Sequence, residues 1–176
     1  MKRHLVLTGF MGSGKTTIGR CLSKTTGLDF VDSDEEVLLQ TGLHPVRYIR
    51  RFGLSSFRKI EKRVVHSILT GPPVILSTGG GSILDHRNRA LMLQSGFVVW
   101  LKAPLWVLMG RIRRRSGLPS YIRPRSVRDL QALVEKREPY YRLAHLKVMN
   151  AFDPPEKVAN EIVRKYKKKN APGPFE

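Results

Sequence analysis

Short apolar runs alternate with stretches of helical periodicity along most of this chain. The apolar runs predict strands buried on both faces of a sheet, because such strands are nearly continuous in hydrophobicity. We expect strands at residues 4–8, 27–34, 74–78, 96–102 and 145–149. Apolar residues spaced three and four apart predict helices at residues 17–25, 35–41, 42–52, 55–69, 87–94, 105–115, 126–143 and 156–165. This alternation predicts an α/β fold, with a mostly parallel, five-stranded sheet covered by helices on both faces.

The 176 residues predict one domain, over residues 1–170, because no internal repeat or linker divides them. The basic stretch 164–170 predicts a frayed helix end, and residues 171–176 predict a flexible tail. No apolar run approaches the length of a membrane span or of a signal peptide. Cys21 is the one cysteine, which excludes an intrachain disulfide and suits a core position in a reducing compartment. We therefore expect a cytoplasmic protein with no membrane partner.

A glycine-rich motif of the form G-x-x-x-x-G-K-[ST] runs from Gly9 to Thr16, directly after the first predicted strand. Glycines in this pattern let backbone N–H groups point inward and cradle phosphate oxygens at the start of the following helix. Lys15 can reach the β- and γ-phosphates, and the Thr16 hydroxyl can bind Mg²⁺. The motif therefore predicts a nucleotide phosphate site.

Polar residues and glycines end the next two predicted strands at the same edge of the sheet. Asp32 and Asp34 lie at the end of the second strand and share a face, although Asp34 could instead cap the next helix. Three glycines at 79–81 follow the third strand and suit a turn that faces a ligand or simply a tight turn. Arg58 and Glu61 lie three apart on one helix face, where a plain surface ion pair is an adequate explanation.

Basic residues outnumber acidic ones, with 32 Lys and Arg against 14 Asp and Glu, a net charge of +18 and a pI near 10.7. Seven arginines fall between Arg111 and Arg128 without an acidic residue, around a stretch whose glycine, prolines and serines predict a mobile loop. A basic loop over a phosphate site suits a lid, at about residues 112–125, that neutralises a transferring phosphoryl group.

Six motifs, in order, resemble those of the shikimate kinase family. They are Gly-Phe-Met-Gly-Ser-Gly-Lys-Thr-Thr-Ile-Gly at 9–19, Asp-Ser-Asp at 32–34, Thr-Gly at 41–42, Phe-Arg-x-x-Glu at 57–61, Thr-Gly-Gly-Gly at 78–81 and Arg-x-Pro-x-Tyr at 137–141. The resemblance covers roughly residues 5–162. It implies a P-loop kinase fold of the nucleoside-monophosphate-kinase type, with strand order 2-3-1-4-5 and a mobile lid, in a monomer. It also implies ATP-dependent phosphorylation of the 3-hydroxyl of shikimate, with Mg²⁺, on the pathway to chorismate and aromatic amino acids.

Matched by position, the resemblance also implies a role for each site residue. ATP would contact Gly12, Ser13, Gly14, Lys15, Thr16, Thr17 and Arg111, the last near adenine. Shikimate would contact Asp34, Arg58, Glu61, Gly79, Gly80, Gly81 and Arg137. Lys15 and Asp34 would be catalytic, with Asp34 assisting loss of the proton from the attacking hydroxyl. Thr16 would bind Mg²⁺ directly, and Asp32 would orient it through water.

Two positions depart from the family pattern. The family's lid usually carries Arg-Pro-Leu-Leu, where this chain has Leu118-Pro119-Ser120-Tyr121, so that Arg115 or Arg123 would have to substitute for the lid arginine. The family often has Gly-Glu before the Phe-Arg motif, where this chain has Gly53-Leu54. The first departure bears on turnover and lid closure more than on substrate binding.

Two other functions remain open from the sequence. One is a P-loop kinase of another small hydroxylated substrate, such as gluconate or a nucleoside monophosphate. The set of Asp34, Arg58, Gly80 and Arg137 suits a carboxylated polyol and therefore argues against a nucleotide acceptor in particular. The other is a non-catalytic, basic nucleic-acid-binding relative, but no interleaved aromatics offer a stacking platform, and we expect no specific nucleic-acid partner.

Overall fold

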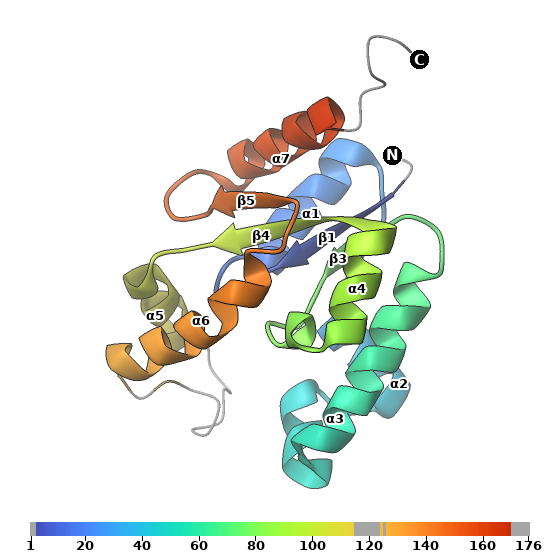
Figure 1. Ribbon diagram of the computed structural model, residues 1–176, viewed down its shortest axis with the longest axis vertical. Coiled ribbons are helices and arrows are strands. Elements are labelled where there is room, and N and C mark those ends of the chain that lie inside the picture. The colour runs from blue at the N-terminus through green and yellow to red at the C-terminus, as the bar shows by residue number, and fades with distance from the viewer. Residues whose placement is uncertain (1–2, 115–123, 125, 170–176) are drawn as a thin grey trace.

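The computed structural model describes residues 3–114, 124 and 126–169 (Figure 1). Within them, five strands form one sheet in the order β2-β3-β1-β4-β5, and every neighbouring pair is parallel. The strands are β1 (His4–Thr8), β2 (Phe30–Asp32), β3 (Ile75–Ser77), β4 (Gly96–Lys102) and β5 (Leu146–Met149). In the centre of the sheet, Val6 of β1 is in register with Leu76 of β3 and Val98 of β4. The predicted fold class and strand order are confirmed.

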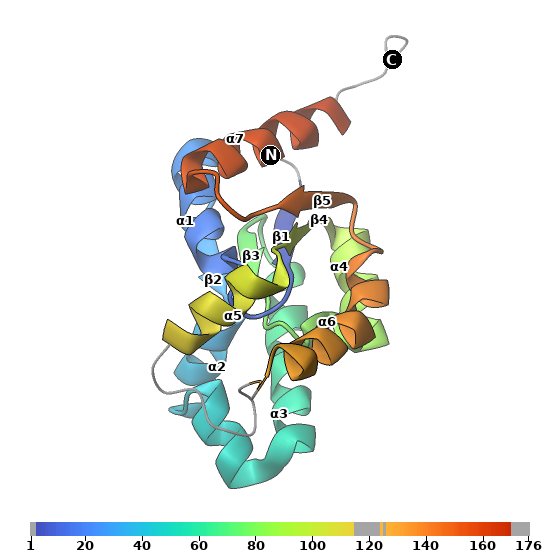
Figure 2. The ribbon, with the colours of Figure 1, turned by 90° about the vertical axis from the view of Figure 1, so that its left-hand side faces the viewer.

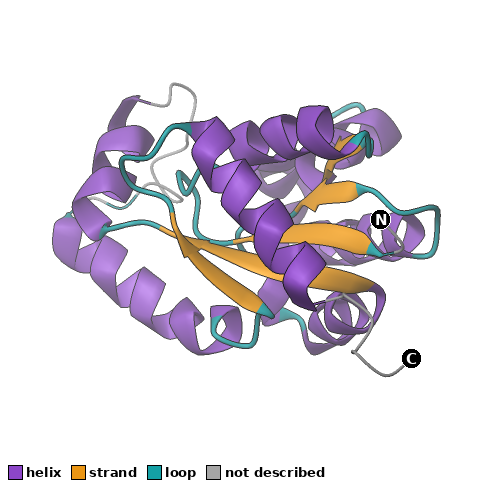
Figure 3. Ribbon diagram, turned by 90° about the horizontal axis from the view of Figure 1, so that it is seen from above, coloured by secondary structure: helices purple, strands orange, loops and turns teal. Residues whose placement is uncertain are grey.

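Helices cover both faces of this sheet, as the sequence predicts (Figures 2 and 3). They are α1 (Lys15–Thr26), α2 (Ser33–Thr41), α3 (Pro45–Leu69), α4 (His86–Ser95), α5 (Leu105–Arg114), α6 (Val127–Tyr141) and α7 (Pro155–Lys169), with a 3₁₀ turn, η1 (Ser82–Leu84). On one face, α1 and α7 bury Leu22 and Ile162 against the strands. On the other face, α3 and α4 bury Val65 and Met92. No helix in the described ranges is long and apolar enough to cross a membrane.

Several helix boundaries differ from the predicted ones. The two helices expected at 42–52 and 55–69 are both present within α3 and are separated by a kink at Gly53, whose backbone is not helical (φ 80°, ψ 162°), but the first of them begins at Pro45 rather than at residue 42. The helix α7 continues to Lys169, where the sequence suggested a frayed end, and Tyr166 anchors this last stretch in the core. Pro139 lies inside α6, which continues to Tyr141. The longer helix α7 is explained by burial of one of its faces. The basic residues of the stretch 164–170 make this buried face hard to recognise from the sequence.

Two of the sequence-based expectations concern residues that lie outside the described ranges. The predicted lid at 112–125 is described only at 112–114 and 124, so Arg115, the segment 118–121 and Arg123 are outside them. The predicted tail at 171–176 is outside them as well. Cys21 is half-buried rather than fully buried, and it packs against the core between α1 and α7.

Candidate active site

The loop between β1 and α1, together with the first two residues of α1, forms the predicted phosphate loop (residues 9–16). Gly9, Gly12 and Gly14 have φ angles of 144°, 79° and 92°, which other residues rarely adopt. Since α1 begins at Lys15, the N–H groups of the loop lie at a helix N-terminus, where the helix dipole favours anions. Lys15 Nζ donates to the carbonyl oxygens of Gly9 and Phe10, at 3.0 and 3.1 Å, and is therefore held beside the loop.

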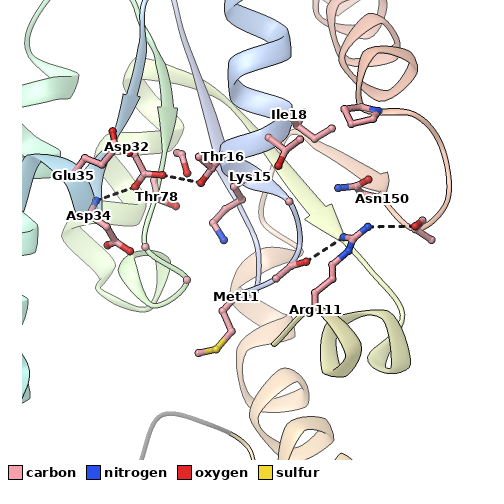
Figure 4. Close-up of a pocket in the computed structure, with 18 of the residues that line it drawn as sticks. Met11, Lys15, Thr16, Ile18, Asp32, Asp34, Glu35, Thr78, Arg111 and Asn150 are labelled. Atoms are coloured by element: carbon pink, nitrogen blue, oxygen red, sulfur yellow. Dashed lines mark hydrogen bonds between the residues drawn. The ribbon is translucent and has the colours of Figure 1, made fainter. Parts of the chain in front are cut away.

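Thr16 and Asp32 meet at the start of α1 and the end of β2 (Figure 4). Thr16 Oγ1 donates to Asp32 Oδ2 at 2.9 Å, and Asp32 Oδ1 accepts from the backbone N–H of Asp34 at 3.0 Å. The N-cap of α2 is thus Asp32, and the alternative that Asp34 caps this helix is wrong. Donation to Asp32 leaves the lone pairs of the Thr16 hydroxyl for a cation. One hydroxyl and one carboxylate, completed by phosphate and water, fit Mg²⁺, which takes oxygen ligands.

The glycine turn after β3 (residues 79–81) brings the predicted acceptor residues together. A Cβ on Gly79 would lie 2.8 Å from Glu61 Oε1 and 3.2 Å from Asp34 Oδ1, so both carboxylates reach this turn. A Cβ on Gly81 would lie 2.9 Å from Arg58 Cζ, so the guanidinium occupies the space that a side chain would fill. The turn therefore faces charged groups, which favours the ligand-facing alternative over a simple tight turn.

Glu61 is a buried carboxylate rather than part of a surface ion pair. Its side chain is 2 % exposed and is ion-paired with Arg58, whose side chain is 34 % exposed. Its other oxygen accepts from the Ser82 hydroxyl at 2.5 Å. Helical spacing alone could not distinguish this arrangement from a solvated pair, because the burial comes from the packing of α3 against η1.

Gly80, in the same turn, is held from α6. Its carbonyl oxygen accepts from the Tyr141 hydroxyl at 2.6 Å and from Arg137 Nη1 at 3.4 Å. Burial raises the pKa of Tyr141 to about 12, so its hydroxyl stays protonated and continues to donate. The Arg137 guanidinium also lies over the Phe10 ring, 5.0 Å from its centroid, and so connects the turn with the phosphate loop.

The other end of the site contains residues that sequence analysis assigned only to a turn. Asn150 follows β5 and donates from Nδ2 to the carbonyl oxygen of Ser13 at 2.7 Å. Phe152, 77 % exposed, pairs with Trp106 of α5 at a centroid distance of 5.3 Å. The one feature of the sequence that could have placed Asn150 in the site is its position at the carboxyl end of a predicted parallel strand, because open α/β sheets bind ligands there. Arg111, which was predicted, donates to the carbonyl oxygen of Gly12 at 3.1 Å.

A pocket of about 790 Å³ joins these parts along the carboxyl ends of the strands (Figure 4). The predicted site residues that line it are Gly12, Gly14, Lys15, Thr16, Thr17, Asp32, Asp34, Gly79, Gly80 and Arg111. The predicted residues that do not line it are Ser13, Arg58, Glu61, Gly81 and Arg137. Asp34 lies toward one end and Asn150 toward the other, with Lys15 of the phosphate loop between them. This volume is in the range that holds a nucleotide or a drug-sized ligand.

Comparison with known proteins identifies the family. A family model described as shikimate kinase matches residues 11–167. The chain belongs to the shikimate kinase family. A shikimate kinase from Nitrobacter winogradskyi is 36 % identical over 161 residues, which cover 92 % of this chain and 75 % of the relative. One from Paramagnetospirillum magneticum is 40 % identical over 156 residues, which cover 88 % and 79 %.

Solved structures of this family have the same fold. The shikimate kinase of Acinetobacter baumannii, in complex with shikimate, has a TM-score of 0.89 and 29 % identity, covering 97 % of this chain and 96 % of that one. The shikimate kinase of Aquifex aeolicus has a TM-score of 0.84 and 30 % identity, covering 97 % and 99 %. Membership of the shikimate kinase family makes this chain an ATP-dependent phosphotransferase with an alcohol acceptor.

Proposed function

We propose that this protein transfers the γ-phosphoryl group of ATP to the 3-hydroxyl of shikimate. The observation that carries the proposal is the gathering of Asp34, Glu61 and Arg58 around the glycine turn, beside the phosphate loop. Shikimate is a small anion with one carboxylate and three hydroxyls, so its binding needs a cation and hydrogen-bonding groups together. The A. baumannii relative was solved with shikimate bound, which supports the same acceptor here.

Arg58 and Arg137 are the residues proposed to hold the carboxylate of shikimate. A guanidinium offers several N–H donors in a plane and matches a carboxylate in a two-pronged contact. The ion pair with buried Glu61 fixes the Arg58 guanidinium against Gly81 before the substrate arrives. An acceptor that lacks a carboxylate would leave both arginines without this contact. Gluconate also carries a carboxylate, on an open polyol chain, so the choice of shikimate over gluconate rests on the relative solved with shikimate and is tested by the comparison of acceptors below.

Asp34 is proposed to orient the attacking hydroxyl and to accept its proton. The hydroxyl oxygen forms a bond to the γ-phosphorus while the bond from that phosphorus to the β,γ-bridging oxygen breaks, and ADP leaves with those electrons. Lys15 and the N–H groups of the phosphate loop balance the charge that develops on the phosphoryl oxygens. Mg²⁺, held by Thr16 and Asp32, would neutralise further phosphate charge. Positioning and charge stabilisation thus supply most of the catalysis.

A coupled ADP-release assay with Mg·ATP tests this proposal by comparing shikimate, quinate, gluconate and AMP as acceptors. We expect turnover that depends on shikimate and exceeds that with the other three. Asp34→Asn should reduce kcat by about a hundredfold or more, because the amide keeps the size of the side chain but cannot accept the proton. ADP affinity should change little in this variant. Faster turnover with gluconate or AMP, or near-normal kcat in Asp34→Asn, would contradict the assignment of the acceptor site.

A further inference from the structure

Two side chains bind backbone carbonyl groups of the phosphate loop on the side away from Asp34 (Figure 4). Arg111 donates to the carbonyl oxygen of Gly12 at 3.1 Å, and Asn150 donates to that of Ser13 at 2.7 Å. Arg111 also donates to the carbonyl oxygen of Ala151 at 3.3 Å, so it connects the phosphate loop with the segment that follows β5. The loop is therefore fixed by side chains that are distant from it in sequence.

We infer that Asn150 is a positioning residue for the phosphate loop, which holds the loop in the conformation that binds nucleotide. In a trans peptide unit the carbonyl and the N–H of the next residue point in opposite directions. Holding the Ser13 carbonyl on Asn150 therefore points the N–H of Gly14 the other way, as a phosphate cradle requires. Asn150 acts through this peptide unit, whereas Lys15 and Thr16 are the residues proposed to contact phosphate or metal.

The fit between Asn150 and the loop is close. Asn150 is 5 % exposed and Ser13 is 1 % exposed, so water cannot readily replace the amide as a partner of the Ser13 carbonyl. A Cβ on Gly14 would collide with Asn150 Nδ2, so the loop backbone and this amide occupy adjoining space without a gap. Loss of the amide would leave a buried carbonyl without its donor and would open space into which the loop could relax.

The inference rests on the nucleotide site of the proposed function and not on the identity of the acceptor. Binding of Mg·ADP, measured by calorimetry without acceptor, is therefore the appropriate measurement. Asn150→Ala should weaken ADP binding about tenfold, which is the effect of losing one buried hydrogen bond. Shikimate binding to the same variant should stay within about twofold of the unaltered protein, because the acceptor residues lie around the glycine turn.

Asn88 of α4 provides a matched control. It is 3 % exposed and likewise donates from Nδ2 to a backbone carbonyl, that of Ser82, at 3.3 Å, but on the acceptor side of the molecule. Asn88→Ala should leave ADP affinity within about twofold while costing comparable stability. A selective loss of ADP affinity in the Asn150 variant, and not in the Asn88 variant, would separate positioning of the loop from general stabilisation.

A second substitution covers the case in which Asn150→Ala does not fold. Asn150→Asp keeps the volume of the side chain but replaces the donor by a carboxylate, which repels the Ser13 carbonyl, so it should weaken ADP binding more than alanine does. Unchanged ADP affinity in either variant, or an equal loss of ADP and shikimate affinity, would overturn the inference. Failure of the unaltered protein to bind ADP would instead contradict the nucleotide site, and ADP binding without shikimate turnover would contradict only the proposed acceptor.

Discussion

A single methyl group at Gly81 should displace the Arg58 guanidinium and weaken binding of the acceptor. The backbone at Gly81 has φ −106° and ψ −7°, which alanine adopts without strain. The added Cβ would lie 2.9 Å from both Cζ and Nη1 of Arg58, and closer still to Nη2. Side chains essentially never approach this closely, so the flexible arginine must move. Gly81→Ala therefore perturbs Arg58 through space alone, without a change in its charge.

The size of the effect follows from what the guanidinium would lose. Hydrogen bonds to charged groups contribute about 1.5–3 kcal/mol each, so loss of the contact between Arg58 and the shikimate carboxylate should raise the KM for shikimate about 10- to 100-fold. Displacement would also separate Arg58 from Glu61, which is 2 % exposed and, among the residues that the structure describes, would then keep the hydrogen bond from Ser82 alone. We expect a loss of about 1–3 kcal/mol in the free energy of unfolding from this buried carboxylate. The KM for ATP should stay unchanged.

Steady-state kinetics with each substrate varied, together with urea unfolding, measure these quantities. Gly110→Ala is the matched control, because Gly110 lies in α5 and the added Cβ would have none of its described surroundings within 4 Å, and it should stabilise the helix by about 0.5–1 kcal/mol. Gly81→Ala should raise the KM for shikimate no more than Arg58→Ala does, and the double variant should have the same KM for shikimate as Arg58→Ala alone. A KM for shikimate within twofold of normal in Gly81→Ala would refute the reasoning.

Two further predictions concern other parts of the molecule. Phe152→Ala should raise the KM for ATP about fivefold or more in steady-state kinetics, because a nucleobase stacks on aromatic rings, and ADP should alter the fluorescence of Trp106, the partner ring of Phe152. Phe52→Ala is the control, because Phe52 is 49 % exposed on α3. An equal KM for ATP in the unaltered protein and in both variants would exclude stacking. Burial lowers the pKa of His4 and of His145, each of which accepts a backbone N–H bond through Nδ1, at 3.2 and 3.0 Å. The folded state therefore favours the neutral form of both histidines. The free energy of unfolding should be highest above their ordinary pKa, near 6.5, and should fall as the pH drops below 6.5 toward the lowered pKa values of the folded protein. Urea midpoints at about pH 7.5 and about pH 5.5 test this, and replacing both histidines by glutamine should flatten the difference.

The sequence predicted the elements that depend on local pattern and missed those that depend on contacts between distant segments. The phosphate loop and the strand order follow from glycine spacing, apolar runs and the family motifs. The bond from Asn150 to Ser13 joins residues 137 positions apart, and no local signal encodes it. The choice between Asp32 and Asp34 as the cap of α2 depends on where the first helical turn begins, and a shift of two residues reverses it. The burial of Glu61 likewise depends on which neighbours cover α3.

The two glycine-rich segments of the site require glycine for different physical reasons, and the strand order connects them. In the phosphate loop, positive φ angles require it, as at Gly12 and Gly14. In the turn after β3, the requirement is space, because a Cβ on Gly80 would lie 3.3 Å from the Gly9 carbonyl oxygen and 3.4 Å from the Met11 nitrogen. The two backbones can approach so closely because β1 and β3 are parallel neighbours, so that both segments leave the sheet at the same edge. A side chain at position 80 would therefore push the acceptor turn away from the phosphate loop, and the distance between acceptor and phosphate would grow even with every charged residue in place.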